Sequence, residues 1–539
     1  MASDGPIASD AFDVAISGYG PTGLTLASLL ARRGHRVCVI ERWPTLYGQP
    51  RMATIDGESA RILQAACDID AALRNALPRA RYVFANGAGD ILIDHRWGGV
   101  DISGFPRRIS VHQPDIEDAM DARARSHGVV VLQGWEVVAI EQDADFASIT
   151  VRERHVGQDG EAVLGDARVV KARYGVGADG AQSRIRTALG IERESWPFRA
   201  AWLSVDSVRK RSLHDFWGLS PDGQVAVIFC VPDGRAHSII PLGTHHVRFN
   251  FQVDPDADHS DKLNSATAYH ALETVYGVTP DDVDVYRQAV YPFEGKLATI
   301  WRIGRVFLAG DAAHLMTPFL GQGGCSALRD AINLAWKLDL VLRGAAPDSL
   351  LNTYQAERLP HTRTYIDGSD RLAALAFVAD PRDAAARDRM LRSGGPPASS
   401  SEPTIEAGIL HRDGHGRIKR PVGEAGPQGI VTHGGRTGRF DDLVDWGFQL
   451  IAWDCDPAET LRADQREFLH TLGTAVARIS SQPAPGNGFI DRDGAYGRTF
   501  QAHGCMAMIM RPDFVIFGIA HSPDDLTKLV DDLRRQLWG

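Results

Sequence analysis

Residues 12–41 read FDVAISGYGPTGLTLASLLARRGHRVCVIE, and this stretch decides the fold. Phe12 to Ser17 is a short apolar run that suits a buried parallel strand. Leu24 to Ala31 is apolar at helical spacing, Gly34 is placed to end that helix, and Val37 to Ile40 is a second apolar run. The order strand, glycine turn, helix, strand predicts the first half of an α/β nucleotide-binding domain.

The glycine turn has the spacing Gly18-x-Gly20-x-x-Gly23. Gly18 permits the tight turn out of the strand, Gly20 lets a pyrophosphate approach the backbone, and Gly23 lets helix and strand pack closely. Pro21 and Thr22 lie at the helix start, where free N–H groups and the positive dipole end attract phosphates. These residues are therefore predicted to bind a dinucleotide. The alternative, a glycine turn in an unrelated α/β unit, does not account for the acidic residue at the end of the second strand.

That acidic residue is Glu41. It lies roughly 20 positions after the glycines, where a carboxylate accepts hydrogen bonds from an adenosine ribose. It would repel a phosphate on that ribose. Arg42 is predicted to lie on the adenine or in solvent.

A second glycine motif lies far downstream. Residues 305–314 read RVFLAGDAAH, and residues 318–324 read PFLGQGG and lead into a long helix predicted over Gln322 to Leu342. A carboxylate at a strand end can accept hydrogen bonds from a polyol, glycines let backbone lie flat against a planar ring, and a helix start stabilises an anionic reduced flavin by ~1 kcal/mol. The residues predicted to bind the cofactor FAD here are Gly310, Asp311, Pro318, Gly321, Gln322, Gly323 and Gly324.

Three motifs in this order resemble the class A flavin-dependent aromatic hydroxylases, the p-hydroxybenzoate hydroxylase group. They are the first glycine turn with Glu41, Gly177-Ala-Asp179-Gly180 followed by Ser183 and Arg184, and Gly310-Asp311 with His314 and Pro318. The resemblance covers roughly residues 10 to 370. It implies that Asp311 contacts the flavin ribityl chain, that the Asp179 motif serves FAD and the nicotinamide cofactor, and that Arg51 and Gln113 touch FAD. His314 is interpreted as a packing residue.

The fold class expected is α/β: a Rossmann-like FAD-binding domain with an inserted β-sheet substrate domain and a C-terminal thioredoxin-like domain. The boundaries are 1–190 and 296–392 for the two parts of the FAD-binding domain with the following helices, 191–295 for the β-rich insertion, and 404–539 for the tail. The breaker-rich stretch 393–403 separates the tail from the rest.

The tail resembles that of the larger family members, in which a hairpin carries an Arg-Pro-Asp sequence like Arg511-Pro-Asp513 here. The 3-(3-hydroxyphenyl)propionate hydroxylases look most similar. The tail has no Cys-x-x-Cys pair, so disulfide exchange is not expected. The tail is interpreted as structural or as part of a subunit interface. If it forms an interface, the expected assembly is a homodimer.

The resemblance implies a reaction in which NADH or NADPH reduces the flavin, O2 then forms a flavin C4a-hydroperoxide, and its distal oxygen attacks a phenolic ring. The backbone around Pro318 to Gly321 is the candidate wall for the hydroperoxide, and the inserted sheet should cover the substrate. Sequence does not single out the group that deprotonates the phenol, for which the candidates are His214, His237, His245, His246, Tyr286 and Tyr291. A substrate carboxylate would want an arginine, and Arg199, Arg235, Arg248 and Arg287 are available.

Composition excludes several other classes. The net charge of −10 argues against nucleic acid as a partner. No apolar run is long enough to span a membrane, and the polar start lacks a signal core, so a cytoplasmic protein is expected. The six cysteines are scattered and are expected to be reduced, and no metal site is expected.

Alternative functions stay open on the same fold. A flavin halogenase would carry a Trp-x-Trp stretch, which none of the eleven tryptophans forms. A polyketide-tailoring or Baeyer–Villiger type monooxygenase acting on a larger polycyclic substrate is the main alternative, because such enzymes share the three motifs and the tail. A flavin-bound protein without enzymatic activity is the third hypothesis.

Overall fold

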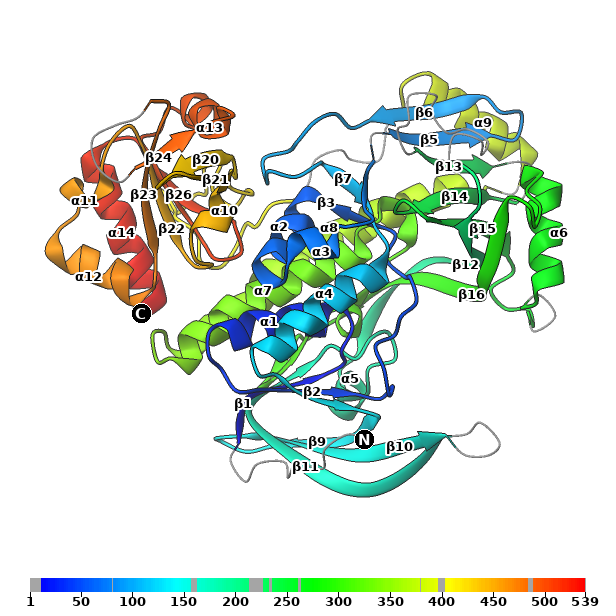
Figure 1. The fold of residues 1–539 in the computed structure, drawn as a ribbon, viewed down its shortest axis with the longest axis horizontal. Coiled ribbons are helices and arrows are strands. Elements are labelled where there is room, and N and C mark those ends of the chain that lie inside the picture. Colours follow the sequence, from blue (N-terminus) through cyan, green and yellow to red (C-terminus); the bar gives the residue numbers. More distant parts are fainter. Residues whose placement is uncertain are drawn as a thin grey trace.

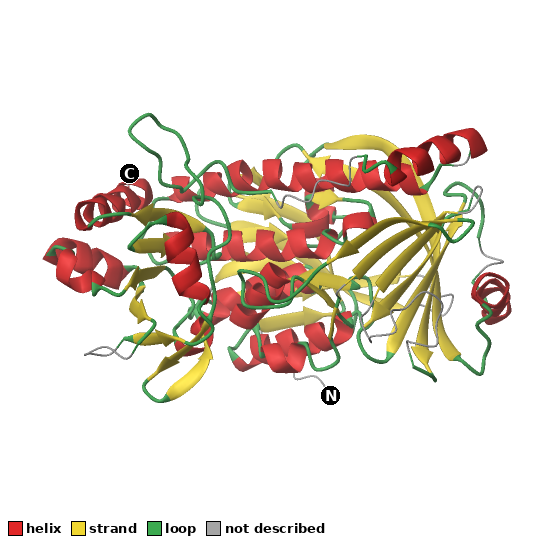
Figure 2. Ribbon diagram, turned by 90° about the horizontal axis from the view of Figure 1, so that it is seen from above, coloured by secondary structure: helices red, strands yellow, loops and turns green. Residues whose placement is uncertain are grey.

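The computed structural model describes residues 11–79, 81–156, 162–212, 226–231, 235–259, 263–378, 380–395, 403–482 and 488–538. The three larger β-sheets with their helices lie in a row, with the C-terminal unit at one end and a large, mostly antiparallel sheet at the other (Figure 1). Figure 2 shows the long helices lying alongside the strands of the central sheet, and the splayed strands of the second sheet far from the C-terminus.

The central sheet is built around the predicted strand–turn–helix–strand unit. β1 pairs in parallel with β2 on one side and β11 on the other, β2 pairs with β8, and β11 pairs with β18. Its strands are β1 (Phe12–Ser17), β2 (Val37–Glu41), β8 (Val130–Gln133), β9 (Trp135–Gln142), β10 (Ala147–Val156), β11 (Ala162–Gly177), β17 (Arg302–Ile303) and β18 (Val306–Leu308). The two glycine motifs, far apart in sequence, thus follow β1 and β18, which lie parallel to β11 on its two sides.

Helices cover this sheet. α7 is buried along almost its whole length, and α1 packs against both α7 and α4. The helices of this unit are α1 (Pro21–Arg32), α2 (Gly57–Ala66), α3 (Ile69–Ala72), α4 (Gln113–Ser126), α5 (Arg184–Ala188), α7 (Gly323–Leu342) and α8 (Thr353–Ala376), with 3-10 turns η3 (Gly310–Ala312), η4 (Pro318–Leu320) and η5 (Asp348–Asn352). A small sheet of β3 (Thr54–Asp56), β4 (Leu77–Pro78) and β7 (Arg108–Ser110) contacts α2 and α7 through β3.

The second sheet has the strand order β19-β16-β12-β15-β14-β13-β5-β6. Most of it comes from the β-rich insertion, but β5 and β6 come from earlier in the chain and join through the parallel pairing of β13 with β5. Its elements are β5 (Arg81–Asn86), β6 (Ile91–Arg96), β12 (Arg193–Arg209), β13 (Ala226–Val231), β14 (His237–Leu242), β15 (His246–Val253), β16 (Val283–Ala298) and β19 (His314–Leu315), flanked by α6 (Ser265–Tyr276) and α9 (Pro381–Arg392). A hairpin of the first segment therefore completes the sheet expected to cover the substrate.

The C-terminal unit is a seven-stranded mixed sheet with helices packed on it. Its parallel strands are β22, β23 and β24, and β25 and β26 form an antiparallel hairpin that turns at Arg511-Pro512-Asp513, where a hairpin was expected. The elements are β20 (Ile430–His433), β21 (Arg436–Arg439), β22 (Gln449–Trp453), β23 (Ala475–Ser480), β24 (Phe489–Asp491), β25 (Ala507–Met510), β26 (Ile516–Ala520), α10 (Phe440–Leu443), α11 (Pro457–Thr460), α12 (Ala463–Thr471), α13 (Ala495–His503) and α14 (Pro523–Trp538). The expected fold class is confirmed.

Within the described residues, no helix combines the length and the apolarity needed to cross a membrane. The same residues contain no cluster of His, Cys, Asp and Glu side chains that could hold a metal ion.

Candidate active site

The first glycine turn has the geometry that its sequence predicts. Gly18 has φ +103°, and a Cβ there would collide with the carbonyl oxygen of Ala178. A Cβ on Gly23 would collide with the carbonyl oxygen of Gly18, whereas a Cβ on Gly20 would have no atom within 4 Å. Gly18 and Gly23 are thus required for packing, and the space beside Gly20 is open for a ligand.

Helix α1 begins without a side-chain cap. Its N-cap is Gly20, no side chain accepts a hydrogen bond from its first turn, and that turn carries no acidic residue. Its first N–H groups therefore keep both their hydrogen-bonding capacity and the positive end of the helix dipole for an anion.

Glu41 lies at the end of β2, beside this turn. Its carboxylate accepts hydrogen bonds from the backbone N–H groups of Tyr19 (2.8 Å) and Trp43 (3.0 Å) and lines the main cavity of the protein. Arg42 is exposed, with its guanidinium 5.4 Å from the ring centre of Trp43. The sequence expectation for Arg42, adenine or solvent, is compatible with this position.

The second motif contacts the first. Gly310 has φ +61°, and a Cβ there would collide with Oγ1 of Thr22 in α1. Asp311 lines the cavity, burial raises the pKa of its carboxyl group, and no hydrogen bond to it comes from the residues that the structure describes. A carboxylate held in a cavity in this way fits the hydroxyl groups of a polyol chain.

Helix α7 starts at the same cavity. Gly321 ends η4 with φ +64°, and α7 then begins with no side-chain cap and no acidic residue in its first turn. A Cβ on Gly324 would collide with the sulfur of Met52. The Gln322 side chain is engaged elsewhere: it donates to Asp56 (3.1 Å) and accepts from Arg329 (3.0 Å), so only its backbone is available to a cofactor.

Gln113 holds the loop that carries Arg51. Its Oε1 accepts hydrogen bonds from the backbone N–H groups of Arg51 (3.0 Å) and Met52 (2.7 Å), and its Nε2 donates to Glu117 (2.7 Å). Arg248 binds the same loop from the second sheet, donating to the carbonyl oxygens of Pro50 and Arg51. The Arg51 guanidinium lies 4.7 Å from the ring centre of Tyr47 and lines the cavity.

Asp179 caps α5. One carboxylate oxygen accepts from the N–H groups of Arg184 (2.8 Å) and Ile185 (3.1 Å). The other, Oδ1, is buried and has no hydrogen-bond partner, and burial raises the pKa of the group. This buried acceptor beside the phosphate turn is a second position that a ligand hydroxyl or amide would satisfy.

A single cavity of about 1150 Å³ connects these positions. Every predicted cofactor residue lines it except Gly23 and Gly310, which serve the packing contacts described above. The cavity exceeds the roughly 300–1,000 Å³ of a typical small-molecule site. Two uncapped helix starts, free carboxylate oxygens and this volume together fit FAD with space beyond it.

The far part of the cavity is apolar and aromatic. Trp202, Phe293 and Phe319 pack there with ring centres 5.9–6.1 Å apart, and Phe319 directly follows Pro318. We call these three residues the aromatic chamber. None of the three was among the predicted site residues, nor were Arg79, Tyr82, His95 and Trp97, which line the cavity from β5, β6 and the residues next to β4 and β6. Nothing in the local sequence around these residues indicated that they face a cavity.

Most candidate bases lie away from the cavity. His237 is bonded to the Tyr276 hydroxyl (2.7 Å), and His246 stacks on His112 with ring centres 4.1 Å apart. Neither lines the cavity, nor do His245 and Tyr286, whereas Tyr291 does, and burial raises the pKa of Tyr291. His214 lies outside the described residues. His314 is buried, stacks on Trp301 and bonds to Asp330 (2.7 Å), as a packing residue would.

The four arginines considered for a substrate carboxylate either pair with an aspartate or lie outside the cavity. Arg248 and Arg287 share the single carboxylate of Asp206, at 2.7 and 2.9 Å, and both also donate to the Pro50 carbonyl oxygen, so much of their hydrogen-bonding capacity is already used. Arg199 pairs with Asp256 at 2.7 Å and, like Arg235, does not line the cavity.

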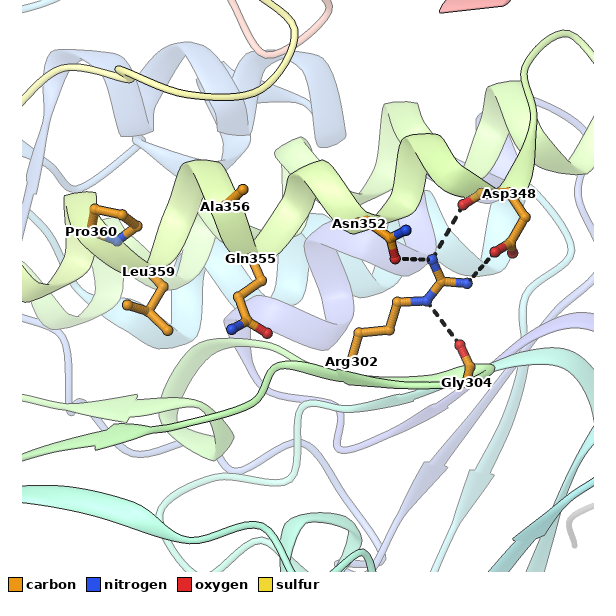
Figure 3. Close-up of a pocket in the computed structure, with 8 residues that line it drawn as sticks. All are labelled: Arg302, Gly304, Asp348, Asn352, Gln355, Ala356, Leu359 and Pro360. Carbon is orange, nitrogen blue, oxygen red and sulfur yellow. Dashed lines mark hydrogen bonds and ion pairs between the residues drawn. The ribbon is translucent and has the colours of Figure 1, made fainter. Parts of the chain in front are cut away.

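A second pocket of about 600 Å³ lies between α8 and the β17–β18 turn (Figure 3). Arg302 dominates it, but its guanidinium donates to Gly304, Asp348 and Asn352 (Figure 3). With these donors committed, the pocket offers little to an anion.

The chain belongs to the family described as FAD binding domain, which it matches over residues 11–369; residues 423–536 match the family described as HcaD C-terminal domain. Its fold and site define a class A flavoprotein hydroxylase, as the sequence motifs indicated.

Among curated proteins, it is 34 % identical over 532 residues to a "probable NADH-specific resorcinol 4-hydroxylase" of Rhodococcus jostii (strain RHA1), covering 97 % of this chain and 94 % of that one. It is 30 % identical over 551 residues to the 3-(3-hydroxy-phenyl)propionate/3-hydroxycinnamic acid hydroxylase of Escherichia coli (strain K12), covering 98 % and 95 %.

Solved structures share the fold. The flavin-dependent monooxygenase PieE, in complex with FAD and substrate, superposes with a TM-score of 0.77 at 21 % identity, covering 98 % of this chain and 99 % of that one. Aklavinone-11 hydroxylase, with FAD and aklavinone, gives 0.73 at 23 %, covering 98 % and 100 %.

Proposed function

We propose that this protein is an FAD-dependent monooxygenase that hydroxylates a phenolic substrate, such as 3-(3-hydroxyphenyl)propionate, with NADH or NADPH and O2. The observation that carries the proposal is the continuous cavity that joins two uncapped helix starts to the aromatic chamber beside Pro318. Relatives named as resorcinol and hydroxyphenylpropionate hydroxylases, similar over nearly the whole chain, support the substrate class.

The proposed FAD contacts follow the geometry. The start of α1 binds the pyrophosphate, Glu41 the ribose, Asp311 the ribityl chain, and the start of α7 the pyrimidine side of the flavin ring. The full proposed set is Gly18, Gly20, Pro21, Thr22, Gly23, Glu41, Arg42, Arg51, Gln113, Asp179, Gly310, Asp311, Pro318, Gly321, Gln322, Gly323 and Gly324. When bound, FAD supplies hydride acceptance and dioxygen activation.

The chain's own residues then have three tasks. The aromatic chamber holds the ring and keeps water out of the site. The backbone from Pro318 to Gly321 forms the wall between chamber and cofactor. The start of α7 stabilises negative charge that develops on the bound ring system.

The test is substrate-stimulated NADH and NADPH oxidation by the purified yellow protein. The panel contains 3-(3-hydroxyphenyl)propionate, resorcinol and simple phenols, with product identification and O2 uptake. We expect at least one phenol to stimulate oxidation and to yield a ring-hydroxylated product. A broad panel without stimulation would contradict the simple-phenol proposal.

A polyketide-tailoring or Baeyer–Villiger type reaction on a larger polycyclic substrate is the second candidate. The volume of the cavity favours it, since the space extends beyond the cofactor positions. Polycyclic phenols added to the panel distinguish the two candidates.

A cytoplasmic location and a homodimer complete the proposal. The buried, unpaired thiols of Cys38, Cys67 and Cys325 are consistent with a reducing compartment. Light scattering of the holoenzyme measures the assembly.

A further inference from the structure

One arginine in the cavity wall differs from all the others that are buried. In the part of the chain that the structure describes, seven arginines are buried, and six of them pair with a carboxylate: Arg61, Arg248, Arg329, Arg358, Arg387 and Arg511. Arg79, only 8 % exposed, has no ion pair with the described residues. Its Nε and Nη2 atoms are buried and have no hydrogen-bond partner.

The environment of Arg79 makes its charge costly. Its own backbone N–H donates to the carbonyl oxygen of Arg108 (2.8 Å), which brings a second guanidinium close. Burial and the charge of Arg108 lower the pKa of Arg79 to about 9. A buried charge is normally paired, and unsatisfied buried donors are rare in folded proteins. An anion bound in the cavity would resolve both problems at once.

The position of Arg79 relates it to the proposed reaction centre. It follows β4 and lines the same cavity as the aromatic chamber. Tyr82 and Ile93, from the neighbouring strands β5 and β6, also line that cavity and pack against the cluster that contains Trp202, Phe293 and Phe319. A ligand with its ring in the chamber and an anionic arm extending past Tyr82 and Ile93 would reach the guanidinium.

We propose that Arg79 is the subsite for a carboxylate on the phenolic substrate, so that this enzyme selects phenols with an acidic side arm over neutral phenols. The proposal rests on the proposed function and makes its substrate class narrower. A planar guanidinium binds a carboxylate through two parallel hydrogen bonds, which neither a lysine nor a glutamine reproduces. Arg248 and Arg287, two of the four expected candidates, share the Asp206 carboxylate and also donate to the Pro50 carbonyl oxygen, whereas Arg79 has no carboxylate partner among the described residues.

The experiment compares acid and ester forms of one phenol. The FAD holoenzyme is titrated with 3-(3-hydroxyphenyl)propionate and with its methyl ester, using the change in flavin absorbance, and then assayed for stimulated NADH oxidation. For Arg79→Gln we expect the Kd of the acid to rise about 10- to 100-fold and that of the ester to change less than about 3-fold, because a charge-assisted pair is lost only for the acid. Arg79→Lys should give an intermediate Kd.

Two controls separate binding from folding. Arg81→Gln removes a guanidinium two residues away that pairs with Asp94 (2.7 Å) outside the cavity, and it should leave the acid-to-ester ratio unchanged. Arg79→Gln should keep or raise the melting temperature of the substrate-free holoenzyme, because it removes an unpaired buried charge. A lower melting temperature would make Arg79 a structural residue and overturn the proposal.

Other outcomes also overturn the proposal. The wild type could bind the ester as tightly as the acid, or Arg79→Gln could lose affinity for both ligands equally. A rise in the KM for NADH of Arg79→Gln with either substrate would assign Arg79 to a nucleotide phosphate. A wild type that hydroxylates resorcinol but ignores the acid would overturn this inference while leaving the proposed function intact. A wild type that no phenol stimulates would contradict the proposed function itself.

Discussion

Gly18, Gly20 and Gly23 share a motif but need to be glycine for different reasons. Gly18 and Gly23 are fixed by the protein itself, since a Cβ at either would collide with a backbone carbonyl. Nothing in the protein lies within 4 Å of a Cβ on Gly20, so only a ligand gives that position a reason to be glycine.

This difference gives a prediction for two alanine substitutions. Gly20→Ala should leave the melting temperature of the FAD-free protein within about 1–2 °C of wild type and weaken FAD binding at least about 10-fold, because the methyl group occupies the path of the pyrophosphate. Gly23→Ala should destabilise even the FAD-free protein. Thermal unfolding and titration with FAD measure both effects. Unchanged FAD affinity in Gly20→Ala would contradict the position assigned to the pyrophosphate.

At the scale of elements, the start of α4 fixes the loop that carries Arg51. The sequence resemblance implies that Gln113 touches FAD, and Gln113 lines the cavity. Its side-chain oxygen also holds the backbone of Arg51 and Met52. Glu117, one turn along α4, accepts from Gln113 and thereby orients it. Glu117 is itself buried, with one carboxylate oxygen lacking a partner, and burial raises its pKa to about 7.

The raised pKa predicts a pH dependence of stability. In the unfolded chain a glutamate titrates near pH ~4.3, so between about pH 4.5 and 7 the folded protein binds more protons than the unfolded one. The contribution of Glu117 to the free energy of unfolding therefore falls as pH rises through this window. Glu117→Gln should remove the effect, giving a FAD-free protein about 2–3 kcal/mol more stable than wild type at pH 8 and similar to it at pH 4.5.

Denaturant unfolding of both proteins at the two pH values measures the difference. A gap that stays constant between pH 4.5 and pH 8 would contradict the assignment to Glu117.

Helix α7 shows what the sequence pattern left out. Its apolar positions predicted one buried face and a helix over Gln322 to Leu342, and the structure has α7 over Gly323–Leu342. Its polar face is buried too, since Arg329, Asp330 and Lys337 are all covered by other elements. Helical periodicity identifies the apolar stripe, but a polar residue that is buried by a distant domain looks the same in sequence as one in water.

At the scale of the whole molecule, the C-terminal unit is joined to the FAD-binding unit by a buried charge network. Arg511 pairs with Glu357 of α8 (2.7 Å) and with Asp513, Lys337 of α7 also binds Glu357 (2.8 Å), and Asn333 donates to Asp513 (2.7 Å). Two positive and two negative side chains are thus satisfied together in a site away from water. The hairpin noticed in the sequence is the docking element of the tail.

Removing one charged side chain of this network should lower the stability of the protein. Arg511→Met leaves Glu357 and Asp513 without their main partner, and we expect it to lower the free energy of unfolding by about 3–5 kcal/mol. Arg417→Met, which removes an arginine 67 % exposed from its pair with Asp413, should cost less than about 1 kcal/mol. Chemical denaturation of the holoenzyme compares them. Equal losses in the two variants would argue against the network as the link between the units.

The sequence predicted local features better than long-range pairings. β1 matches the predicted strand at both ends, and the hairpin turns at Arg511-Pro512-Asp513 as expected, because apolar runs, glycines and prolines act within a few residues. The pairing of the β5–β6 hairpin with the second sheet was not predicted, since its partner β13 lies more than 100 residues away and no local pattern encodes that pairing. Arg79 was missed for a related reason: unsatisfied donors become visible only when the surrounding chain is in place.

Gly310 packs so closely against Thr22 that the two glycine motifs form one site, and this has a consequence for biosynthesis. The two halves of the nucleotide site are translated nearly 290 residues apart, and the second half is complete only when α7, ending at Leu342, has left the ribosome. A nascent chain carrying β1 and α1 alone exposes apolar surface without its partner helix and has no flavin to stabilise it. Early release or truncation before α7 should therefore yield material that aggregates, and FAD supply should affect yield only after that helix is made.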